Sequence, residues 1–290
     1  MLQGSMVAIV TPFKDGKIDE TRFRELIEFQ ITEGISAIVP CGTTGESATL
    51  THEEHDRVVK IAVESVAGRV PVVAGTGSNS TQEAVELTKH AQKSGADAAL
   101  LITPYYNKPT QQGLYEYFKA VADAADIPII LYNVPGRTAV NLLPQTVARL
   151  AEIENIQAIK EASGSIAQVS EILNLCGSKI TVLSGDDALT FPIMAIGGMG
   201  VISVAANIVP SRMAEMVNAC LDSSWEQARN LHLSLFPLFQ SMFFETNPIP
   251  VKTALAMMGK IEEEFRSPLC PISAANREKL SEVLKMYKII

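Results

Sequence analysis

Eight short apolar runs recur along the chain, and segments with helical periodicity lie between them. In segments such as 23–31 and 58–66, apolar residues repeat at the spacing of one helix face. Since a helix between two strands returns the chain to the same end of a sheet, this alternation predicts parallel pairing. The predicted strands are residues 6–10, 35–39, 70–74, 98–102, 128–132, 156–160, 180–183 and 199–204.

Eight strand–helix units favour an α/β fold of the closed (β/α)8 type, a TIM barrel. After residue 204 the pattern is only helical, with helices predicted over 211–222, 225–244, 250–258 and 274–287. We therefore expect a catalytic barrel in residues 1–210 and a C-terminal helical extension in residues 211–290, packed on the barrel as one structural unit. A doubly wound open sheet is the alternative, but no GxGxxG turn opens the first helix.

Two helix starts show the spacing of a capping box, in which an N-cap hydroxyl and a glutamate three residues later bond each other's backbone N–H groups. They are Thr51 with Glu54 and Ser80 with Glu83. Glycines at positions 34 and 95 lie where the preceding helices are expected to end. These signals place helix boundaries on either side of the second and third predicted strands.

Composition indicates a packed globular domain, since 47% of residues are hydrophobic and 19% are charged. The net charge of -8 and the absence of a basic stripe argue against nucleic acid or anionic lipid as partners. No apolar stretch is long enough to span a bilayer, and the first residues lack the features of a secretory signal. A cytoplasmic location is expected, with no membrane association.

Four widely spaced cysteines without a CxxC pair suggest neither a zinc site nor a disulfide framework. Cys41 follows a predicted strand, but no histidine stands at a strand end to activate it, so a packed thiol is expected. His52 and His55 lie three residues apart on one helical turn. They lack a third ligand, and no metal site is predicted.

Catalytic groups of a parallel barrel come from the carboxyl ends of its strands, which here are followed by hydroxyls, glycines and one amine. Lys160 ends the predicted strand 156–160, where alternation places it on the same face as Ala158. If that face points inward, burial lowers the pKa of the amine and makes it a nucleophile. The alternative is a lysine whose side chain extends from the strand end to solvent.

Two other strand ends carry candidate chemistry. Tyr132 ends the strand one unit before Lys160, so its phenol could exchange protons there. The alternative is an amphipathic core tyrosine whose hydroxyl finds a partner. Residues 42–45, Gly-Thr-Thr-Gly, offer backbone N–H groups and two hydroxyls, as a bound carboxylate requires. The alternative is a tight loop that merely needs glycine.

Three segments together resemble the dihydrodipicolinate synthase branch of the N-acetylneuraminate lyase family, the class I pyruvate aldolases. They are residues 42–46 (GTTGE), 132–138 (YNVPGRT) and 159–164 (IKEASG), and the resemblance covers nearly the whole chain. It implies a lyase that condenses pyruvate with L-aspartate 4-semialdehyde in diaminopimelate and lysine biosynthesis, as a 4-hydroxy-tetrahydrodipicolinate synthase does. The reaction runs through a covalent imine and needs no metal or organic cofactor.

The same resemblance implies a role for each site residue. Lys160 forms the imine and Tyr132 transfers protons, in a relay with Thr43 and Tyr106. Substrates are bound by Thr44, which holds the pyruvate carboxylate, and by Arg137, which holds the carboxylate of the semialdehyde. Gly185 leaves room for the ligand, and Ile202 offers a backbone carbonyl near the imine.

The resemblance also implies assembly and regulation. Tyr106 reaches the active site of a neighbouring subunit, so a homotetramer built as a dimer of dimers is expected. L-Lysine is the expected feedback inhibitor. Its predicted allosteric site consists of Ser47, Ala48, His52, His55, Asn79, Glu83 and Tyr105.

Three other functions fit parts of the sequence. Another pyruvate-dependent aldolase or dehydratase would act on a sugar acid, and Arg137 with Gly136 argues against it. A non-catalytic barrel could bind an amino acid near His52 and His55 and would need no reactive amine. A phosphate-binding barrel enzyme predicts an anion loop after the last strands, where residues 184–187 bring negative charge instead.

Overall fold

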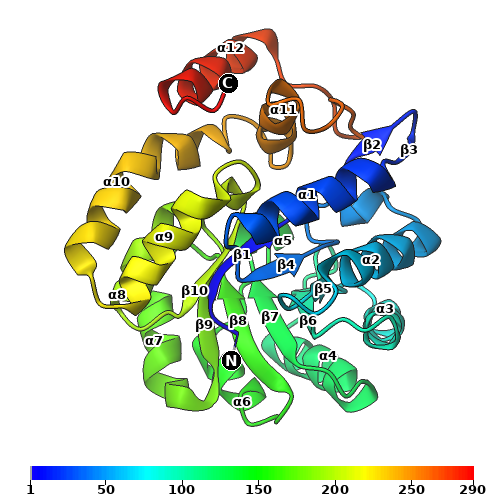
Figure 1. Cartoon of the computed structure of the whole chain (residues 1–290). Helices are drawn as coiled ribbons and strands as arrows, with labels where there is room; N and C mark the ends of the chain where they lie inside the picture. The colour runs from blue at the N-terminus through cyan, green and yellow to red at the C-terminus, as the bar shows by residue number, and fades with distance from the viewer. Residues whose placement is uncertain (1) are drawn as a thin grey trace.

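The computed structural model describes residues 2–290, in which eight parallel strands form a closed barrel (Figure 1). Neighbours in the sheet follow the order β4-β1-β10-β9-β8-β7-β6-β5, and a parallel bridge between Ile38 and Val72 joins the two ends. The strands are β1 (Gly4–Ala8), β4 (Ala37–Val39), β5 (Val73–Gly75), β6 (Ala98–Ile102), β7 (Ile129–Asn133), β8 (Ile156–Glu161), β9 (Thr181–Ser184) and β10 (Gly200–Ser203). All eight coincide with predicted runs, so the predicted TIM barrel is confirmed.

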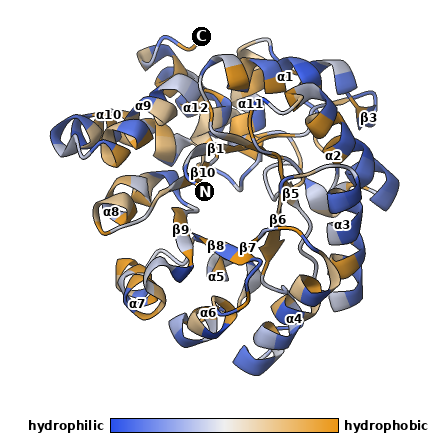
Figure 2. Ribbon diagram, turned by 60° about the horizontal axis from the view of Figure 1, so that its bottom comes forward, coloured by the Kyte–Doolittle hydropathy of each residue, from blue (hydrophilic) through white to orange (hydrophobic). Residues whose placement is uncertain are grey.

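Helices surround the strands, and hydrophilic residues lie mainly on these outer helices (Figure 2). The helices between strands are α1 (Glu20–Thr32), α2 (His52–Val66), α3 (Thr81–Lys93), α4 (Gln111–Ala124), α5 (Pro135–Thr138), α6 (Pro144–Leu150), α7 (Ile166–Cys176) and α8 (Thr190–Ala195). The helices after the last strand are α9 (Pro210–Leu221), α10 (Trp225–Ser241), α11 (Ile249–Met257) and α12 (Ala274–Met286). The expected helical C-terminal part is therefore present, whereas its division from the barrel at residue 210 stays a prediction.

A small antiparallel hairpin, β2 (Phe13–Lys14) with β3 (Lys17–Ile18), follows β1 and was not predicted. Each strand has only two residues, too few to show an alternating pattern. Asp15 and Gly16 form its turn, both with positive φ. The hairpin places the fully buried Phe13 beside the C-terminal segment, where the ammonium of Lys252 lies 4.4 Å from its ring centroid.

One of the two predicted capping boxes is formed. Thr51 accepts a hydrogen bond from the Glu54 N–H (3.2 Å), and the Glu54 carboxylate accepts one from the Thr51 N–H (3.0 Å). At α3 the Ser80 hydroxyl accepts from the Glu83 N–H, but the Glu83 carboxylate binds the side chains of Ser78 and His52 instead. The second prediction was therefore half wrong, because tertiary partners hold the Glu83 side chain away from the helix start.

Side chains of the strands divide into two cores, one inside the barrel and one between strands and helices. Ala158 belongs to the inner core and Ile159 to the outer one. Lys160 follows on the inward face and is only 6% exposed, as the alternation predicted. Within residues 2–290, no helix is both long and apolar enough to cross a membrane.

Candidate active site

A cavity of about 470 Å³ opens at the carboxyl ends of the strands. Residues that follow β4 and β5 line it together with Tyr132 of β7 and Arg137 of α5. A wall that sequence analysis missed comes from Thr246, Asn247 and Pro248, immediately before α11. No periodic pattern connects this segment to the strand ends, so only the folded chain brings it there.

Lys160 lies at the end of β8 beside Tyr132 at the end of β7, since the two residues are paired in the strand register. The Lys160 ammonium is 4.3 Å from the centroid of the Tyr132 ring. Burial lowers the pKa of Lys160 to about 8, with Asp187 opposing and Arg137 adding to the shift. About one amine in ten is then neutral at pH 7, compared with about one in a few thousand for an ordinary lysine. Such an amine can attack a carbonyl carbon.

Tyr132 is buried, and burial raises the pKa of its phenol. The charge of Arg137 and a hydrogen bond with Thr43 act in the opposite direction. The phenol thus stays protonated near neutral pH and has a hydroxyl partner on the loop after β4. This arrangement can pass a proton between the neighbourhood of Lys160 and Thr43.

Thr44 and Arg137 both contact Asn247. The Asn247 amide donates to the Thr44 hydroxyl (3.0 Å), and the Arg137 guanidinium donates to the Asn247 backbone carbonyl (3.2 Å). Thr44 is 3% exposed, so its hydroxyl faces the protein interior rather than bulk water. Arg137 and Asn247 line the cavity, whereas Thr44 lies behind Asn247 and outside the lining. A guanidinium at the cavity matches a ligand with a carboxylate group.

Gly185 lies directly against Lys160, and its role in leaving room for a ligand stays a prediction. A Cβ at position 185 would lie 2.7 Å from the Ala162 Cβ, 3.1 Å from Cγ of Lys160 and 3.2 Å from its Cε. Ile202 of β10 is buried in the inner core of the barrel. Glycine therefore lets the Lys160 and Ala162 side chains pack directly against the backbone at position 185.

Asp187 is a buried carboxyl that sequence reasoning did not assign to the site. Its Oδ2 accepts from the Val204 and Ala205 N–H groups (3.1 and 2.9 Å), while Oδ1 has no hydrogen-bond partner within residues 2–290. Burial raises the pKa of Asp187 to about 6. Its charge favours the protonated form of Lys160, and so opposes the effect of burial. The sequence feature that could have indicated this residue is the pair Asp186–Asp187, which follows β9.

Known proteins resemble the chain over its whole length. The family model of the dihydrodipicolinate synthetase family matches residues 1–287. The chain belongs to this family. A 4-hydroxy-tetrahydrodipicolinate synthase from Thermodesulfovibrio yellowstonii is 64% identical, with all of both chains covered.

Two solved structures have nearly the same fold. A monomeric dihydrodipicolinate synthase variant is 43% identical with a TM-score of 0.98, over 99% of this chain and 97% of that one. The enzyme from Cyanidioschyzon merolae with lysine bound is 40% identical with a TM-score of 0.97, over 99% of both chains. The predictions of family membership and of a class I aldolase-type lyase are confirmed.

The residues predicted to bind L-lysine gather on one side of the same cavity, and all but Asn79 line it. Nε2 of His52 lies 2.8 Å from Glu83, and this hydrogen bond raises the pKa of His52. His55 is buried, and its Nε2 donates to the Gly75 carbonyl (2.7 Å). Asn79 lies outside the cavity lining and accepts from Asn107 through its backbone carbonyl (2.8 Å).

Tyr105 and Tyr106 differ although they are neighbours in the loop after β6. Tyr105 lines the cavity, whereas Tyr106 is 90% exposed and has a positive φ of 70°. The structure thus does not bring Tyr106 into the cavity of its own chain. Its predicted place in a proton relay requires a second subunit.

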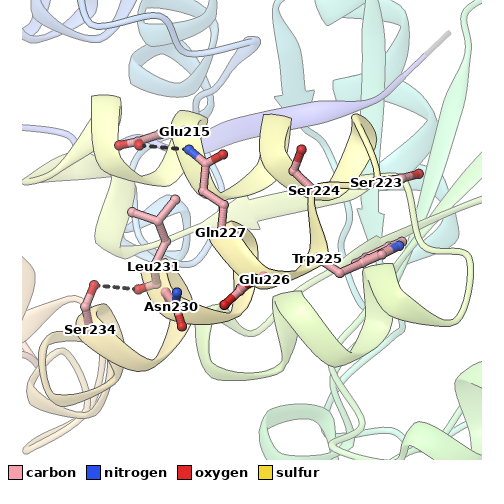
Figure 3. A pocket seen from close by; sticks show the side chains of 9 residues that line it. All are labelled: Glu215, Ser223, Ser224, Trp225, Glu226, Gln227, Asn230, Leu231 and Ser234. Atoms are coloured by element: carbon pink, nitrogen blue, oxygen red, sulfur yellow. Dashed lines mark hydrogen bonds between the residues drawn. The ribbon is translucent and has the colours of Figure 1, made fainter.

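A second hollow lies at the turn between α9 and α10, around Trp225 (Figure 3). Gln227 donates to Glu215 there (3.3 Å), and Ser234 donates to the Leu231 carbonyl (2.8 Å). Serines, amides and carboxylates line this hollow, and no strand-end residue reaches it. It offers neither a reactive amine nor a cationic group, so we place the candidate active site at the strand ends.

Proposed function

We propose that the chain condenses pyruvate with L-aspartate 4-semialdehyde to give 4-hydroxy-tetrahydrodipicolinate, through an imine on Lys160. The observation that carries the proposal is the buried Lys160 amine beside the Tyr132 phenol at the open end of the barrel. The similarity to 4-hydroxy-tetrahydrodipicolinate synthases supports these two substrates. We further propose that the enzyme acts in the cytoplasm, in lysine biosynthesis.

The proposed steps use only side chains of the protein. Neutral Lys160 attacks the pyruvate carbonyl carbon, and loss of water leaves a protonated imine. Loss of a methyl proton gives an enamine, whose carbon attacks the aldehyde and leaves a hydroxyl group there. The amino group from the semialdehyde then attacks the imine carbon, which closes the ring and releases Lys160. Covalent catalysis splits one difficult step into easier ones.

Hydroxyl groups carry out the proton transfers in these steps. Tyr132 is close enough to Lys160 to protonate the departing oxygen, and Thr43 can pass protons to and from the phenol. Tyr106 of a neighbouring subunit would connect this relay to solvent. Thr44 would bind the pyruvate carboxylate, and Arg137 the carboxylate of the semialdehyde.

Borohydride reduction in the presence of pyruvate tests the imine directly. We expect a covalent pyruvate adduct on Lys160 in the wild type and none in Lys160→Met. Lys260→Met is the control, because that lysine lies over the ring of Phe29 in α1. If Lys160 stays unmodified, the proposed imine mechanism is wrong. If a coupled assay shows that a sugar acid reacts faster than L-aspartate 4-semialdehyde, the proposed second substrate is wrong.

We also propose L-lysine as an inhibitor that binds beside Glu83 and His52. The lysine-bound relative supports the ligand, and the Glu83 carboxylate offers a partner for its ammonium group. Inhibition should weaken at least tenfold in Glu83→Gln. It should persist in Glu86→Gln, whose carboxylate in the same helix contacts only Gln82. A rate that does not respond to L-lysine would contradict this proposal.

Finally, we propose a homotetramer built as a dimer of dimers. The exposure of Tyr106 supports it, because a relay that includes this phenol needs a neighbouring chain. The monomeric relative shows that the fold itself does not require assembly. Sedimentation of the purified protein decides the matter, and a fully active monomer would refute the proposal.

A further inference from the structure

The buried Glu46 carboxylate joins the loop after β4 to the C-terminal segment. Its side chain and that of Lys252 in α11 are both fully buried and form an ion pair. A second bond comes from the Arg266 N–H, which donates to the same carboxylate (3.2 Å). Two residues of the C-terminal segment, more than 200 positions away in the sequence, thus meet the loop at one carboxyl group.

We propose that Glu46, together with Lys252, is a positioning residue for the loop that carries Thr43 and Thr44. The inference rests on the proposed function, because it gives those two threonines their roles. Neither Glu46 nor Lys252 needs to touch the substrates. Their pairing would act by fixing where the loop lies at the rim of the cavity.

Backbone geometry shows why this loop needs anchors. Cys41 and Glu46 have positive φ values of 56° and 55°, a conformation that residues with a Cβ adopt only when their surroundings impose it. At one side of the loop the Thr11 hydroxyl donates to the Gly45 carbonyl (2.7 Å). At the next residue the ion pair holds Glu46. The threonines are thus presented from a turn fixed immediately after them.

The Lys252 ammonium is directed at Glu46 by its aromatic surroundings. It lies 4.4 Å from the centroid of the Phe13 ring and 5.1 Å from that of Phe265, and ring faces attract a cation without accepting a full hydrogen bond. Within residues 2–290, Glu46 is the only side chain to which it donates.

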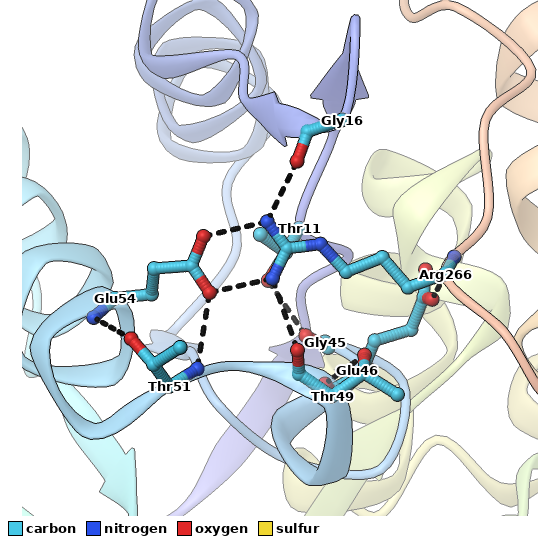
Figure 4. Close-up of polar contacts among 8 residues, drawn as sticks. All are labelled: Thr11, Gly16, Gly45, Glu46, Thr49, Thr51, Glu54 and Arg266. Carbon is cyan, nitrogen blue, oxygen red and sulfur yellow. Dashed lines mark hydrogen bonds and ion pairs between the residues drawn. The ribbon is translucent and has the colours of Figure 1, made fainter.

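Arg266 extends the cluster to the start of α2 (Figure 4). Its guanidinium binds the Glu54 carboxylate with two nitrogens (2.5 and 2.6 Å) and also donates to the Thr49 and Gly16 carbonyls (2.9 and 3.0 Å). Glu54 is the residue that closes the capping box with Thr51. The loop from Glu46 to Thr51 is therefore held at both of its ends by one arginine.

A buried ion pair such as Glu46–Lys252 is weak evidence for a contribution to the free energy of unfolding. Removing both charges of a buried ion pair in favour of apolar side chains of similar volume often leaves stability unchanged or higher, whereas removing one charge is strongly destabilising. A positioning role and a purely structural role therefore differ in the double variant. Only the positioning role predicts a kinetic defect in a protein that is fully folded.

The test compares Glu46→Gln, Lys252→Met and the double variant Glu46→Met/Lys252→Met with the full-length wild type. The number of competent sites is measured as the number of subunits that form the borohydride adduct on Lys160. We expect kcat per competent site to fall at least tenfold in all three variants, and KM for pyruvate to rise at least fivefold. KM for the semialdehyde should change less than twofold, because Arg137 lies on a different element. Lys260→Met is the matched control and should keep wild-type kinetics.

Two outcomes would overturn the proposal. One is a double variant that keeps the wild-type Tm, kcat per site and KM for pyruvate. The other is that both single variants have a lower Tm than the wild type, while kcat per subunit that forms the adduct stays at the wild-type value. The proposed function is tested separately, since the borohydride adduct on wild-type Lys160 does not depend on either variant.

Discussion

The proposed reactivity of Lys160 rests on its position on the inward face of β8. Burial lowers its pKa to about 8, and the neighbouring charges of Asp187 and Arg137 partly cancel each other. The Tyr132 ring covers the ammonium without hydrogen-bonding it. At a pKa of about 8, a usable fraction of this amine is neutral at neutral pH and can attack a carbonyl carbon.

The rate of adduct formation should follow this pKa. With a pKa of about 8, the neutral fraction of Lys160 rises about tenfold between pH 7 and pH 9, whereas an ordinary lysine gains almost a hundredfold. Trapping with borohydride at limiting pyruvate should therefore speed up with pH and level off above about pH 9. A rate that still climbs steeply at pH 10 would contradict the depressed pKa.

Gly185→Ala should slow adduct formation at least tenfold without unfolding the protein. The new methyl group would meet Lys160 Cγ and Cε at 3.1 and 3.2 Å and would displace the amine from its place beside Tyr132. Trapping rates and circular dichroism measure the two effects. In the control Gly113→Ala, the added methyl meets only Pro109 and Thr110 at the start of α4, and trapping should be unchanged.

Helix α2 links the side of the cavity proposed to bind L-lysine to the C-terminal segment. Its capping box uses Glu54, and the same carboxylate binds Arg266. His52 and His55 follow within the first turn of this helix. The start of α2 thus fixes two residues of the proposed lysine site at once.

Loss of the N-cap should therefore cost stability. Thr51→Ala removes the acceptor of the Glu54 N–H, and such changes typically cost about 1 kcal/mol. We expect a lower midpoint in urea unfolding with an unchanged slope. Thr81→Ala is the control, since the Thr81 hydroxyl makes no hydrogen bond within residues 2–290. Equal effects of the two changes would show that the cap contributes nothing.

At the scale of the whole molecule, the C-terminal helices complete the rim of the barrel. Asn247 contacts both Thr44 and Arg137, and Lys252 pairs with Glu46. Segments after residue 240 therefore touch two of the strand-end loops.

Assembly should be visible in the kinetics. If Tyr106 of one subunit serves its neighbour, kcat per site falls when dilution separates the subunits. Tyr106→Phe should lower kcat about a hundredfold, in the range usual for proton transfer, and should make it insensitive to dilution. Activity and sedimentation measured over the same concentration range provide the check. If kcat of Tyr106→Phe still falls on dilution, the dilution effect does not come from Tyr106.

The sequence by itself determined the order of the eight barrel strands and which residues of 156–160 share one face. Alternation placed Ala158 and Lys160 together, and adjacent strand–helix units placed Tyr132 beside them, because local periodicity encodes which side of a strand is buried. The family motifs then named the candidate site residues, whose roles stay predictions.

Only the tertiary structure decided what depends on contacts distant in sequence. No local pattern indicates that Glu83 binds His52 rather than its own helix start, that Asp187 faces Lys160, or that Asn247 joins the cavity wall. Such partners are set by how the barrel closes and by where the C-terminal helices pack. Burial and the charges of Asp187 and Arg137, which together set the pKa of Lys160, exist only once that packing is complete.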